Sequence, residues 1–327
     1  MKDQNTGMYG DIKLFAGTAF PEFAKKVSDY LGVSLSGHDV LHFPNDNLWV
    51  RLHGSVRGQD VYVIQTTSRP VHRNLMELLI TLQTLRLDSA GRVTAVVPYL
   101  AYARSDKKDK PRVPITARLV ADMIEVAGAD RYMTLDLHAG QLQGFFSIPG
   151  DVISAFHILT EYVQNILPQM LDPVVLTADL GFAKKGRNFA VDLDIPIAFV
   201  EKRRADAKRG QAEALTLIGN VQGRDVIIVD DEVDTGGSVC EAAILAKDSG
   251  AENIYMVFVH PVFSPHAVER LAALPLTKII TTDTIPIPSD KRELIADKLH
   301  VCSVAPLLGE VILRAHHGIS VGEMFNE

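Results

Sequence analysis

Residues 226–238, with the sequence VIIVDDEVDTGGS, constrain the fold of this chain more than any other stretch. Four branched apolar residues come first, and such a run is typical of a buried strand. Four acids then fall within five residues, and a Thr-Gly-Gly-Ser turn leads into residues 239–247, which have helical character. The order strand, acidic loop, glycine turn and helix predicts a ligand site, because α/β sheets bind ligands where a strand's carboxyl end faces a helix N-terminus.

The residue types in this stretch suit a sugar phosphate. The two glycines allow the backbone to come close to a ligand, and the N–H groups of the turn and first helical turn can hold a phosphate. Thr235 and Ser238 add hydroxyl donors, whereas Asp230 and Asp231 would repel phosphate but can accept hydrogen bonds from sugar hydroxyls or approach Mg²⁺. We therefore predict a ribose 5-phosphate site. The alternative is a solvated acidic turn, which would not need four acids beside a buried strand.

Composition narrows the class of protein. A chain of 327 residues, 47% hydrophobic and 22% charged, can form two globular α/β domains. Its net charge of −7 argues against a nucleic-acid partner. The two cysteines, Cys240 and Cys302, have neither disulfide-framework nor metal-ligand spacing, which favours a reducing, cytoplasmic setting. We expect no membrane attachment, because there is no signal-like start and no long apolar run.

Apolar runs of strand length alternate with helical patterns along the chain. In the first half, strands are predicted at 13–17, 40–43, 48–52, 61–65, 93–97 and 133–138, and helices at 21–31 and 72–86. In the second half, strands are predicted at 174–177, 197–200, 226–229, 253–259 and 278–281, and helices at 155–166, 239–247 and 304–315. This alternation predicts an α/β fold with parallel sheets in two domains, 8–160 and 161–320, although the last helix could pack back onto the first half.

Several predicted strands are followed by residues that can carry chemistry. Residues 102–112, YARSDKKDKPR, could clamp polyphosphate oxygens or form only a solvated charged loop. His138 is expected to end a strand, where it could reach a metal or a phosphate or serve only packing. Asp179 follows the next predicted strand and is a candidate metal ligand. Residues 201–210, EKRRADAKRG, predict a polar loop whose ordering depends on a ligand, or a solvated turn.

The stretch at 226–238 resembles the phosphoribosyl-diphosphate (PRPP) binding motif of phosphoribosyltransferases and PRPP synthases. Other segments narrow the resemblance to ribose-phosphate diphosphokinases, the PRPP synthases, and occur in the family's order over residues 11–325. These segments are DLHAGQLQGFFSIPGD (136–151), SVRG (55–58), MELLI (76–80), YAR (102–104), EKRR (201–204) and SV (320–321).

The resemblance implies two tandem phosphoribosyltransferase-like domains, each with a mainly parallel sheet flanked by helices. It implies a Mg²⁺-dependent transfer of the β,γ-diphosphoryl group of ATP to the anomeric hydroxyl of ribose 5-phosphate, giving PRPP and AMP for nucleotide biosynthesis. The N-terminal domain would be the nucleotide side and the C-terminal domain the ribose 5-phosphate side. A homo-oligomer, usually a hexamer, is also implied, in which a neighbouring subunit supplies the turn at Phe43.

Residue roles carried over from the family fall into four groups. Catalytic roles fall on Lys202 and Arg204. Ribose 5-phosphate would be held by Arg204, Asp230, Asp231, Asp234, Thr235, Gly236, Gly237 and Ser238. ATP would be bound by Phe43, Asn45, Asp46, Asn47, Arg104 and Ser105, and Mg²⁺ by His138 and Asp179. The cationic groups suit the chemistry, since displacement at phosphorus needs positive charge on the transferring oxygens.

Two positions depart from the family's pattern. Asn47 stands where an acid is usual, and Ser105 stands where glutamine is common. An amide oxygen can still accept a hydrogen bond, but it lacks the charge of a carboxylate. One alternative is therefore a catalytically weak regulatory paralogue that assembles with active subunits. Another is a phosphoribosyltransferase that consumes PRPP, against which the length and the segment around His138 argue.

Overall fold

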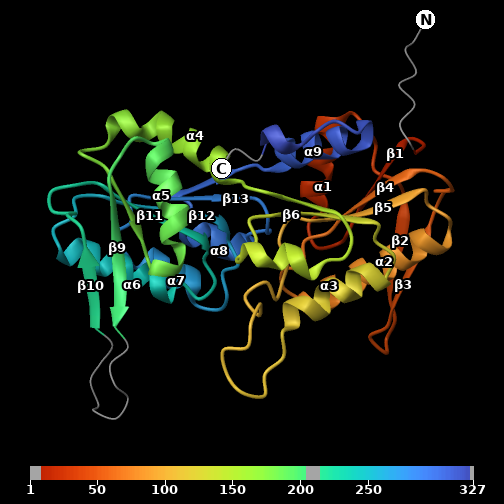
Figure 1. Cartoon of the computed structure of the whole chain (residues 1–327), viewed down its shortest axis with the longest axis horizontal. Helices are drawn as coiled ribbons and strands as arrows, with labels where there is room; N and C mark the ends of the chain where they lie inside the picture. The colour runs from red at the N-terminus through yellow and green to blue at the C-terminus, as the bar shows by residue number, and fades with distance from the viewer. Residues whose placement is uncertain (1–8, 204–213, 325–327) are drawn as a thin grey trace, which may run out of the picture. The chain divides into compact units, whose positions relative to one another are not determined.

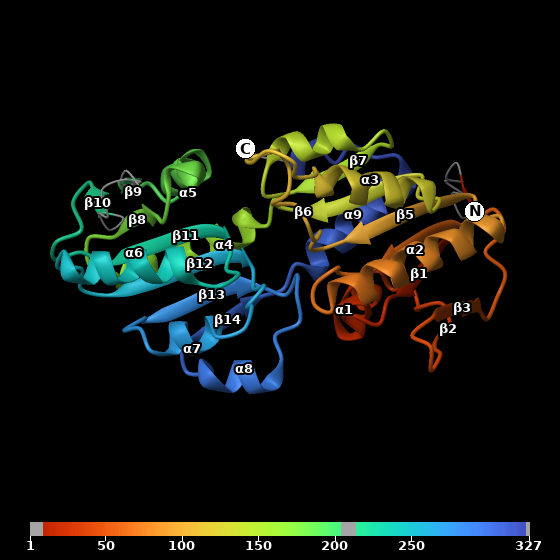
Figure 2. The same cartoon turned by 90° about the horizontal axis from the view of Figure 1, so that it is seen from below.

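The structure, a computed structural model, describes residues 9–203 and 214–324. The chain divides into two compact units (Figures 1 and 2). Unit 1 runs to Ser154 and also includes the chain from Val304 onward, and unit 2 spans Ala155–Ser303. The predicted domains, 8–160 and 161–320, assign the last helix to the second half, whereas its contacts place it in unit 1.

Unit 1 is built on a five-stranded parallel sheet of order β1-β4-β5-β6-β7. The strands are β1 (Ile12–Ala16), β4 (Asp60–Ile64), β5 (Arg92–Val97), β6 (Arg131–Leu135) and β7 (Gly150–Ile153). The helices are α1 (Pro21–Leu31), α2 (Val71–Leu87), α3 (Thr116–Val126) and α9 (Ala305–His317), with short 3₁₀ turns η1 (Gly140–Phe145) and η4 (Gly322–Met324). A separate antiparallel hairpin pairs β2 (His38–His42) with β3 (Leu48–Leu52).

Alternation along β4 explains how helices cover both faces of the unit 1 sheet. Val61 and Val63 belong to the apolar core that contains the buried leucines of α2. Tyr62 points the other way, and its hydroxyl lies 3.4 Å from the carbonyl oxygen of Ile312 in α9. Helix α9 also packs along α1. The C-terminal helix is therefore part of the first unit's core, because its buried apolar face has its partners there (Figure 1).

Unit 2 has a seven-stranded sheet of order β10-β9-β8-β11-β12-β13-β14. Among the strand pairs that the structure describes in this sheet, β9–β10 alone is antiparallel. The strands are β8 (Val174–Thr177), β9 (Ile197–Arg203), β10 (Ala214–Ile218), β11 (Val226–Glu232), β12 (Ile254–His260), β13 (Lys278–Thr282) and β14 (Leu299–Cys302). The helices are α4 (Phe156–Ile166), α5 (Ala183–Asp192), α6 (Gly237–Asp248), α7 (Ala267–Ala272) and α8 (Ser289–Leu294), with 3₁₀ turns η2 (Leu167–Gln169) and η3 (Leu180–Phe182).

The predicted α/β class with mainly parallel sheets is confirmed in both units. Three strand ends differ from the prediction by three residues: β9 and β11 run three residues further than expected, and β6 stops at Leu135, before His138. The extensions persist because neighbouring strands β10 and β12 continue to pair with them. No helix in the described part of the chain is both long and apolar enough to cross a membrane.

Candidate active site

Three neighbouring parallel strands of unit 2 bring predicted site residues to one edge of the sheet. Thr177 of β8 pairs with Phe199 of β9 on one side and with Val229 of β11 on the other, so these residues lie at one level. Asp179 then lies two residues past this level, and Asp230 one residue past it. The strand order β9-β8-β11 therefore gathers a candidate metal ligand and the acidic segment within one unit.

Three of the four acids that were predicted to form a loop, Asp230, Asp231 and Glu232, are instead the last residues of strand β11. Asp230 pairs with Phe258, and Glu232 with His260, so the ladder to β12 continues through the acidic segment. Asp231 is buried, at 5% exposure. The prediction of an acidic loop from residue 230 was wrong at this point, because hydrogen bonding to β12 holds the acids in extended backbone.

The charges at this strand end repel one another. The pKa of Asp230 is raised well above its ordinary value, first by burial and then by the carboxylates of Asp231 and Asp179. The Asp230 carboxylate does accept a hydrogen bond from the backbone N–H of Asp231, at 2.9 Å. The segment is thus electronegative, which suits hydrogen-bond donors such as sugar hydroxyls or a cation, and not a phosphate.

The turn after β11 is fixed by contacts from distant parts of unit 2. Ser264 donates its hydroxyl to the carboxylate of Asp234, and its backbone N–H to the carbonyl of the same residue. Arg270 donates to the carbonyl oxygen of Thr235 at 3.1 Å. Gly236 has a φ of 75°, which only glycine adopts readily, and a Cβ there would meet nothing closer than 3.6 Å. Conformation, and not crowding, is therefore what requires glycine at this position.

Helix α6 begins directly after that turn, at Gly237, with Ser238 as its second residue. Backbone N–H groups of a helix's first turn point away from the helix and attract anions. The order predicted from the sequence, acids followed by a helix N-terminus, is therefore present, with Asp234, Thr235 and Gly236 in the connection. Ser264 and Arg270 support the turn but were not predicted, since no local signal in the sequence links them to it.

Asp179 caps the short turn η3 by accepting a hydrogen bond from the N–H of Phe182 at 3.1 Å. Its side chain is exposed, at the carboxyl end of β8. Among the described residues, no group of three or more His, Cys, Asp or Glu side chains forms a metal cage. Mg²⁺ commonly binds through only one or two carboxylates together with substrate phosphates. The electronegative strand ends of unit 2 fit such a cation, whereas the imidazole of His138 is a poorer donor for a hard ion.

Lys202 lies in strand β9, where its backbone pairs with Leu215 of β10. The prediction of a loop or solvated turn from residue 201 was therefore wrong for residues 201–203. Lys202 is three residues past Phe199, so it stands about 10 Å beyond the level at which β8 ends. Arg204, the other predicted catalytic residue, lies outside the described residues.

In unit 1, the hairpin turn gathers the four residues predicted to bind adenine. Phe43 donates its N–H to the carbonyl of Asn47 at 2.9 Å and accepts the N–H of Asp46 at 2.9 Å. The side chain of Asn45 accepts the N–H of Asn47 at 3.2 Å. Phe43 is 47% exposed, although its side chain is wholly apolar. An exposed aromatic ring on a tight turn is available to stack on a planar ligand.

A cavity of about 530 Å³, lined in part by charged residues, lies in the basic segment that follows β5. Its lining residues are Tyr102, Arg104, Ser105, Lys107, Asp109, Val113 and Pro114. Arg104 and Ser105, the other predicted ATP residues, thus line a hollow and not merely a solvated loop. The hairpin turn and this cavity both belong to unit 1.

His138 is exposed and lies three residues past the end of β6, the strand next to β5. The intervening Asp136 is buried, has a φ of 37° and accepts the hydroxyl of Ser154 at 2.9 Å. The amide of Gln141, in η1, donates to Asp106 at 2.7 Å. This bond links the segment after β6, which carries His138, to the cavity segment after β5.

Comparisons with known proteins cover almost the whole chain. The family model for the N-terminal domain of ribose phosphate pyrophosphokinase matches residues 12–128. The model for the phosphoribosyl synthetase-associated domain matches residues 205–326.

Relatives agree with these family models. The chain is 44% identical to a ribose-phosphate pyrophosphokinase of Caldanaerobacter subterraneus, over 96% of this chain and 98% of that protein. It is 42% identical to the enzyme of that name from Wolinella succinogenes, with the same coverage. A crystal structure of phosphoribosylpyrophosphate synthetase from Mycobacterium smegmatis matches with a TM-score of 0.89 at 38% identity, covering 94% of this chain and 99% of the other. The chain therefore belongs to the ribose-phosphate pyrophosphokinase family, a family of transferases that serve nucleotide biosynthesis.

Proposed function

We propose that this protein is an active ribose-phosphate diphosphokinase. It transfers the β,γ-diphosphoryl group of ATP to the anomeric hydroxyl of ribose 5-phosphate, giving PRPP and AMP. The observation that carries the proposal is the common edge of β9, β8 and β11, three strands paired in register: Lys202 lies in β9, Asp179 follows β8, and the acids lie at the end of β11. Family membership makes this the expected chemistry.

The ribose 5-phosphate site comprises the end of β11, the turn and the start of α6. Asp230 and Asp231 accept hydrogen bonds from ribose hydroxyls. The phosphate lies against the turn and the first turn of α6, where Thr235, Gly236, Gly237 and Ser238 supply N–H and hydroxyl donors. Asp234, held by Ser264, keeps the turn in shape. Arg204, which lies outside the described residues, is part of the proposal as a further ligand of ribose 5-phosphate.

The nucleotide residues belong to unit 1. Phe43 stacks on adenine, and Asn45, Asp46 and Asn47 supply polar contacts at its edge. All four residues belong to one hydrogen-bonded turn, which supports a common role. Arg104 and Ser105 contact the phosphates from the cavity after β5, where the arginine fork suits phosphate oxygens.

Mg²⁺ is the proposed cofactor, and Asp179 is its protein ligand. Burial, and after it repulsion from the neighbouring carboxylates, raises the pKa of Asp230; a cation bound nearby would relieve the repulsion, which favours Mg²⁺ at this edge of unit 2. When bound, the ion neutralises charge on the phosphate oxygens. His138 was predicted as a second ligand; its imidazole better suits a hydrogen bond to a phosphate oxygen.

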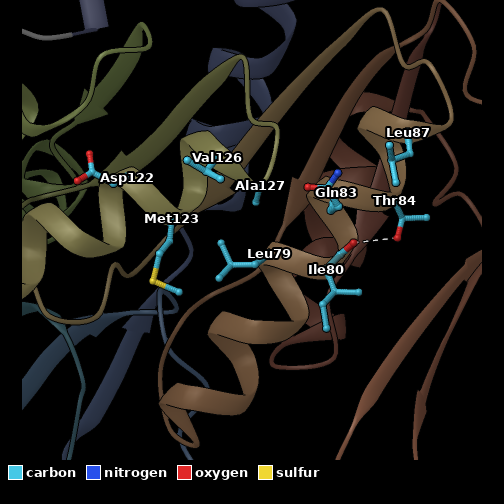
Figure 3. A pocket seen from close by; sticks show the side chains of 9 residues that line it. All are labelled: Leu79, Ile80, Gln83, Thr84, Leu87, Asp122, Met123, Val126 and Ala127. Carbon is cyan, nitrogen blue, oxygen red and sulfur yellow. Dashed lines mark hydrogen bonds between the residues drawn. The ribbon is translucent and has the colours of Figure 1, made fainter.

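A homo-oligomer, in the form of a hexamer, is part of the proposal. An open apolar groove of about 440 Å³ runs between α2 and α3. Figure 3 shows Leu79, Ile80 and Met123 lining it. At its rim, Leu87 is 75% exposed and Val126 is 83% exposed. Apolar surface of this kind marks association surfaces in soluble proteins. We also propose a cytoplasmic location, in keeping with two free, buried cysteines.

AMP formation by the purified chain tests the proposal. We expect AMP from ATP and Mg²⁺ only when ribose 5-phosphate is present, with PRPP formed in equal amount. A chain that binds ribose 5-phosphate but makes no AMP would instead be the regulatory paralogue that Asn47 and Ser105 suggest. Pyrophosphate release that requires PRPP and a nucleobase would indicate a phosphoribosyltransferase.

Replacing Asp230 with asparagine should stabilise the free protein while it weakens substrate binding. The free energy of unfolding should rise by about 1–2 kcal/mol at neutral pH, since a buried acid with a raised pKa resists ionisation. The KM for ribose 5-phosphate should rise about 10–100-fold, because asparagine offers one acceptor oxygen to the ribose hydroxyls where aspartate offers two. Urea denaturation and initial rates measure the two effects.

The pH dependence of this stabilisation provides its control. A raised pKa in the folded state means that the wild type is fully stable below the pKa of the unfolded chain and loses stability as the pH rises through the folded value. The Asp230→Asn variant has no group that titrates at this position, so it does not lose stability in this way as the pH rises. The stability difference should therefore vanish in acid and grow with pH, and a difference independent of pH would contradict the assignment.

A further inference from the structure

Three consecutive carbonyl groups in the turn after β11 each accept a hydrogen bond. The carbonyl of Asp234 accepts the N–H of Ser264 at 3.0 Å. The carbonyl of Thr235 accepts a hydrogen bond from the guanidinium of Arg270 at 3.1 Å. The carbonyl of Gly236 accepts an N–H from the first turn of α6 at 2.9 Å. The direction of each of these peptide groups is therefore fixed by its carbonyl.

The N–H groups of the same peptides point the other way. The peptide bonds of the turn are trans, and in a planar trans peptide the C=O and N–H bonds have opposite directions. The N–H groups of Thr235, Gly236 and Gly237 therefore point away from the donors that hold the carbonyls. No acceptor among the described residues binds these three N–H groups. Successive N–H groups arranged in this way suit the oxygens of a phosphate.

The peptide between Thr235 and Gly236 is the one that a side chain holds. Gly236 has a φ of 75°, and glycine adopts either sign of φ readily. A peptide that precedes a glycine can turn over, as it does between turns of type I and type II. The turned peptide would present the carbonyl oxygen of Thr235 in place of the N–H, and that oxygen would repel a phosphate. The hydrogen bond from Arg270 opposes this rotation.

The position of Arg270 is set by the packing of helix α7. Ala267, Val268 and Leu271 are buried in the core of unit 2, and Arg270 is exposed on the other side of the helix. Burial raises the pKa of the Cys240 thiol, and the guanidinium of Arg270 acts against that rise. The positive charge of Arg270 therefore acts on the first turn of α6 as well as on the carbonyl that it holds.

The segment that leads from β12 to α7 is itself held at several points. Phe263 has a φ of 44°, which a bulky residue keeps only when its surroundings hold it there. Its side chain is buried and packs edge-on against Phe258 of β12, with ring centroids 5.9 Å apart. Its N–H donates to the carbonyl of Val233 at 2.9 Å, and its own carbonyl accepts the ammonium group of Lys291 from α8. The segment is thus a fixed base for the turn.

We propose that Arg270 is a positioning residue for ribose 5-phosphate. By holding the carbonyl of Thr235, it keeps the N–H of Gly236 turned toward the 5-phosphate. Arg270 acts through the backbone, so its side chain need not touch the substrate. This inference rests on the proposed function, in which the turn and the start of α6 bind the phosphate.

Substitutions of this exposed arginine test the inference. Arg270→Met removes the hydrogen bond and keeps an unbranched stem. It should raise the KM for ribose 5-phosphate about 5–20-fold, since one hydrogen bond to a charged phosphate is weakened. The kcat and the KM for ATP should stay within about twofold, because the bond contributes equally to the ground state and the transition state. Arg270→Lys, which can still donate to the carbonyl, should remain within about threefold of the wild type.

The matched control is Arg292→Met, at an exposed arginine of the neighbouring helix α8. It removes a positive charge from the same unit without removing a hydrogen bond to the turn, so all three kinetic constants should keep their wild-type values. The urea midpoint of unfolding should be the same for both methionine variants and the wild type, because both arginines are exposed.

Salt separates positioning from a direct attraction between the guanidinium and the phosphate. Attraction between separated exposed charges weakens as salt screens it, whereas the direction of a peptide group does not depend on screening. The ratio of the KM for ribose 5-phosphate in Arg270→Met to that in the wild type should therefore agree within about twofold at about 0.05 and 0.5 M KCl. A ratio that falls to about one at the higher concentration would overturn the positioning role.

The kinetic results also distinguish this inference from the proposed function. An active wild type with an unchanged KM for ribose 5-phosphate in Arg270→Met overturns the inference and leaves the proposed function intact. Equal increases in the KM values for both substrates overturn it too, since a general structural role would produce them. If the wild type makes no AMP, the proposed function fails, and isothermal titration with ribose 5-phosphate decides the inference. The dissociation constant should still be about 5–20-fold higher for Arg270→Met, whereas equal constants, or no binding by the wild type, would overturn it.

Discussion

Replacing Lys202 with alanine should lower kcat by about 10²–10³-fold, with little change in the KM for ribose 5-phosphate. The transferring diphosphoryl group gathers negative charge on its oxygens as the anomeric oxygen attacks, and catalysis depends on positive charge placed there in advance. An interaction made mainly in the transition state lowers kcat when it is lost, without a matching change in KM. Steady-state rates of AMP formation measure the effect.

The backbone supports this role for Lys202. Strand β9 continues through Arg203 because β10 pairs with it, so Lys202 is attached to a strand and not to a free loop. Its backbone lies three residues past the level at which β8 ends, on the strand next to β8. Lys25→Ala, which removes an exposed lysine on α1, is the control and should keep the wild-type rate. Equal rates for Lys202→Ala and Lys25→Ala would refute the catalytic assignment.

Arg92→Met should destabilise the protein by about 3–5 kcal/mol, the largest stability effect we expect, because it removes the arginine that pairs with a buried carboxylate. Asp60 is fully buried and receives two hydrogen bonds from Arg92, at 2.7 and 2.6 Å. Tyr62 donates to the same carboxylate at 2.9 Å, and His316 of α9 lies 2.8 Å from it. Denaturant unfolding measures the loss.

The hydrogen bonds around Asp60 and Arg92 also connect the C-terminal helix α9 to the rest of unit 1. Arg92 donates to the carbonyl of Ala315 at 3.1 Å, so its loss should lower the protection of α9 amides from hydrogen exchange more than that of α3. The double variant Asp60→Leu/Arg92→Met should recover much of the lost stability, since no charge then remains buried. Arg86→Ala, at an exposed ion pair, should cost less than about 1 kcal/mol. If Arg92→Met and Arg86→Ala lowered the free energy of unfolding by similar amounts, the buried pair would not have the importance assigned to it.

The sequence was sufficient for the fold class because strand and helix periodicities were strong. The hairpin at 40–52 and the strand–turn–helix at 226–247 were predicted from local residue types and are present. The positions at which strands end were predicted less accurately. The acids of β11 look like a loop by themselves, and only their pairing with β12, a separate segment, keeps them extended.

The supporting contacts of the site could not be predicted, because they join residues far apart in the chain. Ser264 is thirty residues from the aspartate that it holds, and Arg270 is thirty-five residues from Thr235. Nothing in the local sequence marks either residue as part of a site. The left-handed backbone of Phe263 likewise depends on its surroundings, since phenylalanine has no preference for it. The predicted roles of Lys202, Asp179 and Arg104 remain predictions that mutagenesis must test.

The fate of labelled phosphorus tests the central claim most directly. The purified chain is given Mg²⁺, ribose 5-phosphate and ATP radiolabelled at either the α- or the β-phosphorus, and the products are separated. The account predicts that the α label appears only in AMP and the β label only in PRPP, because the diphosphoryl group moves as one unit to the anomeric oxygen. A β label recovered in ADP or in free phosphate, with no labelled PRPP, would contradict it.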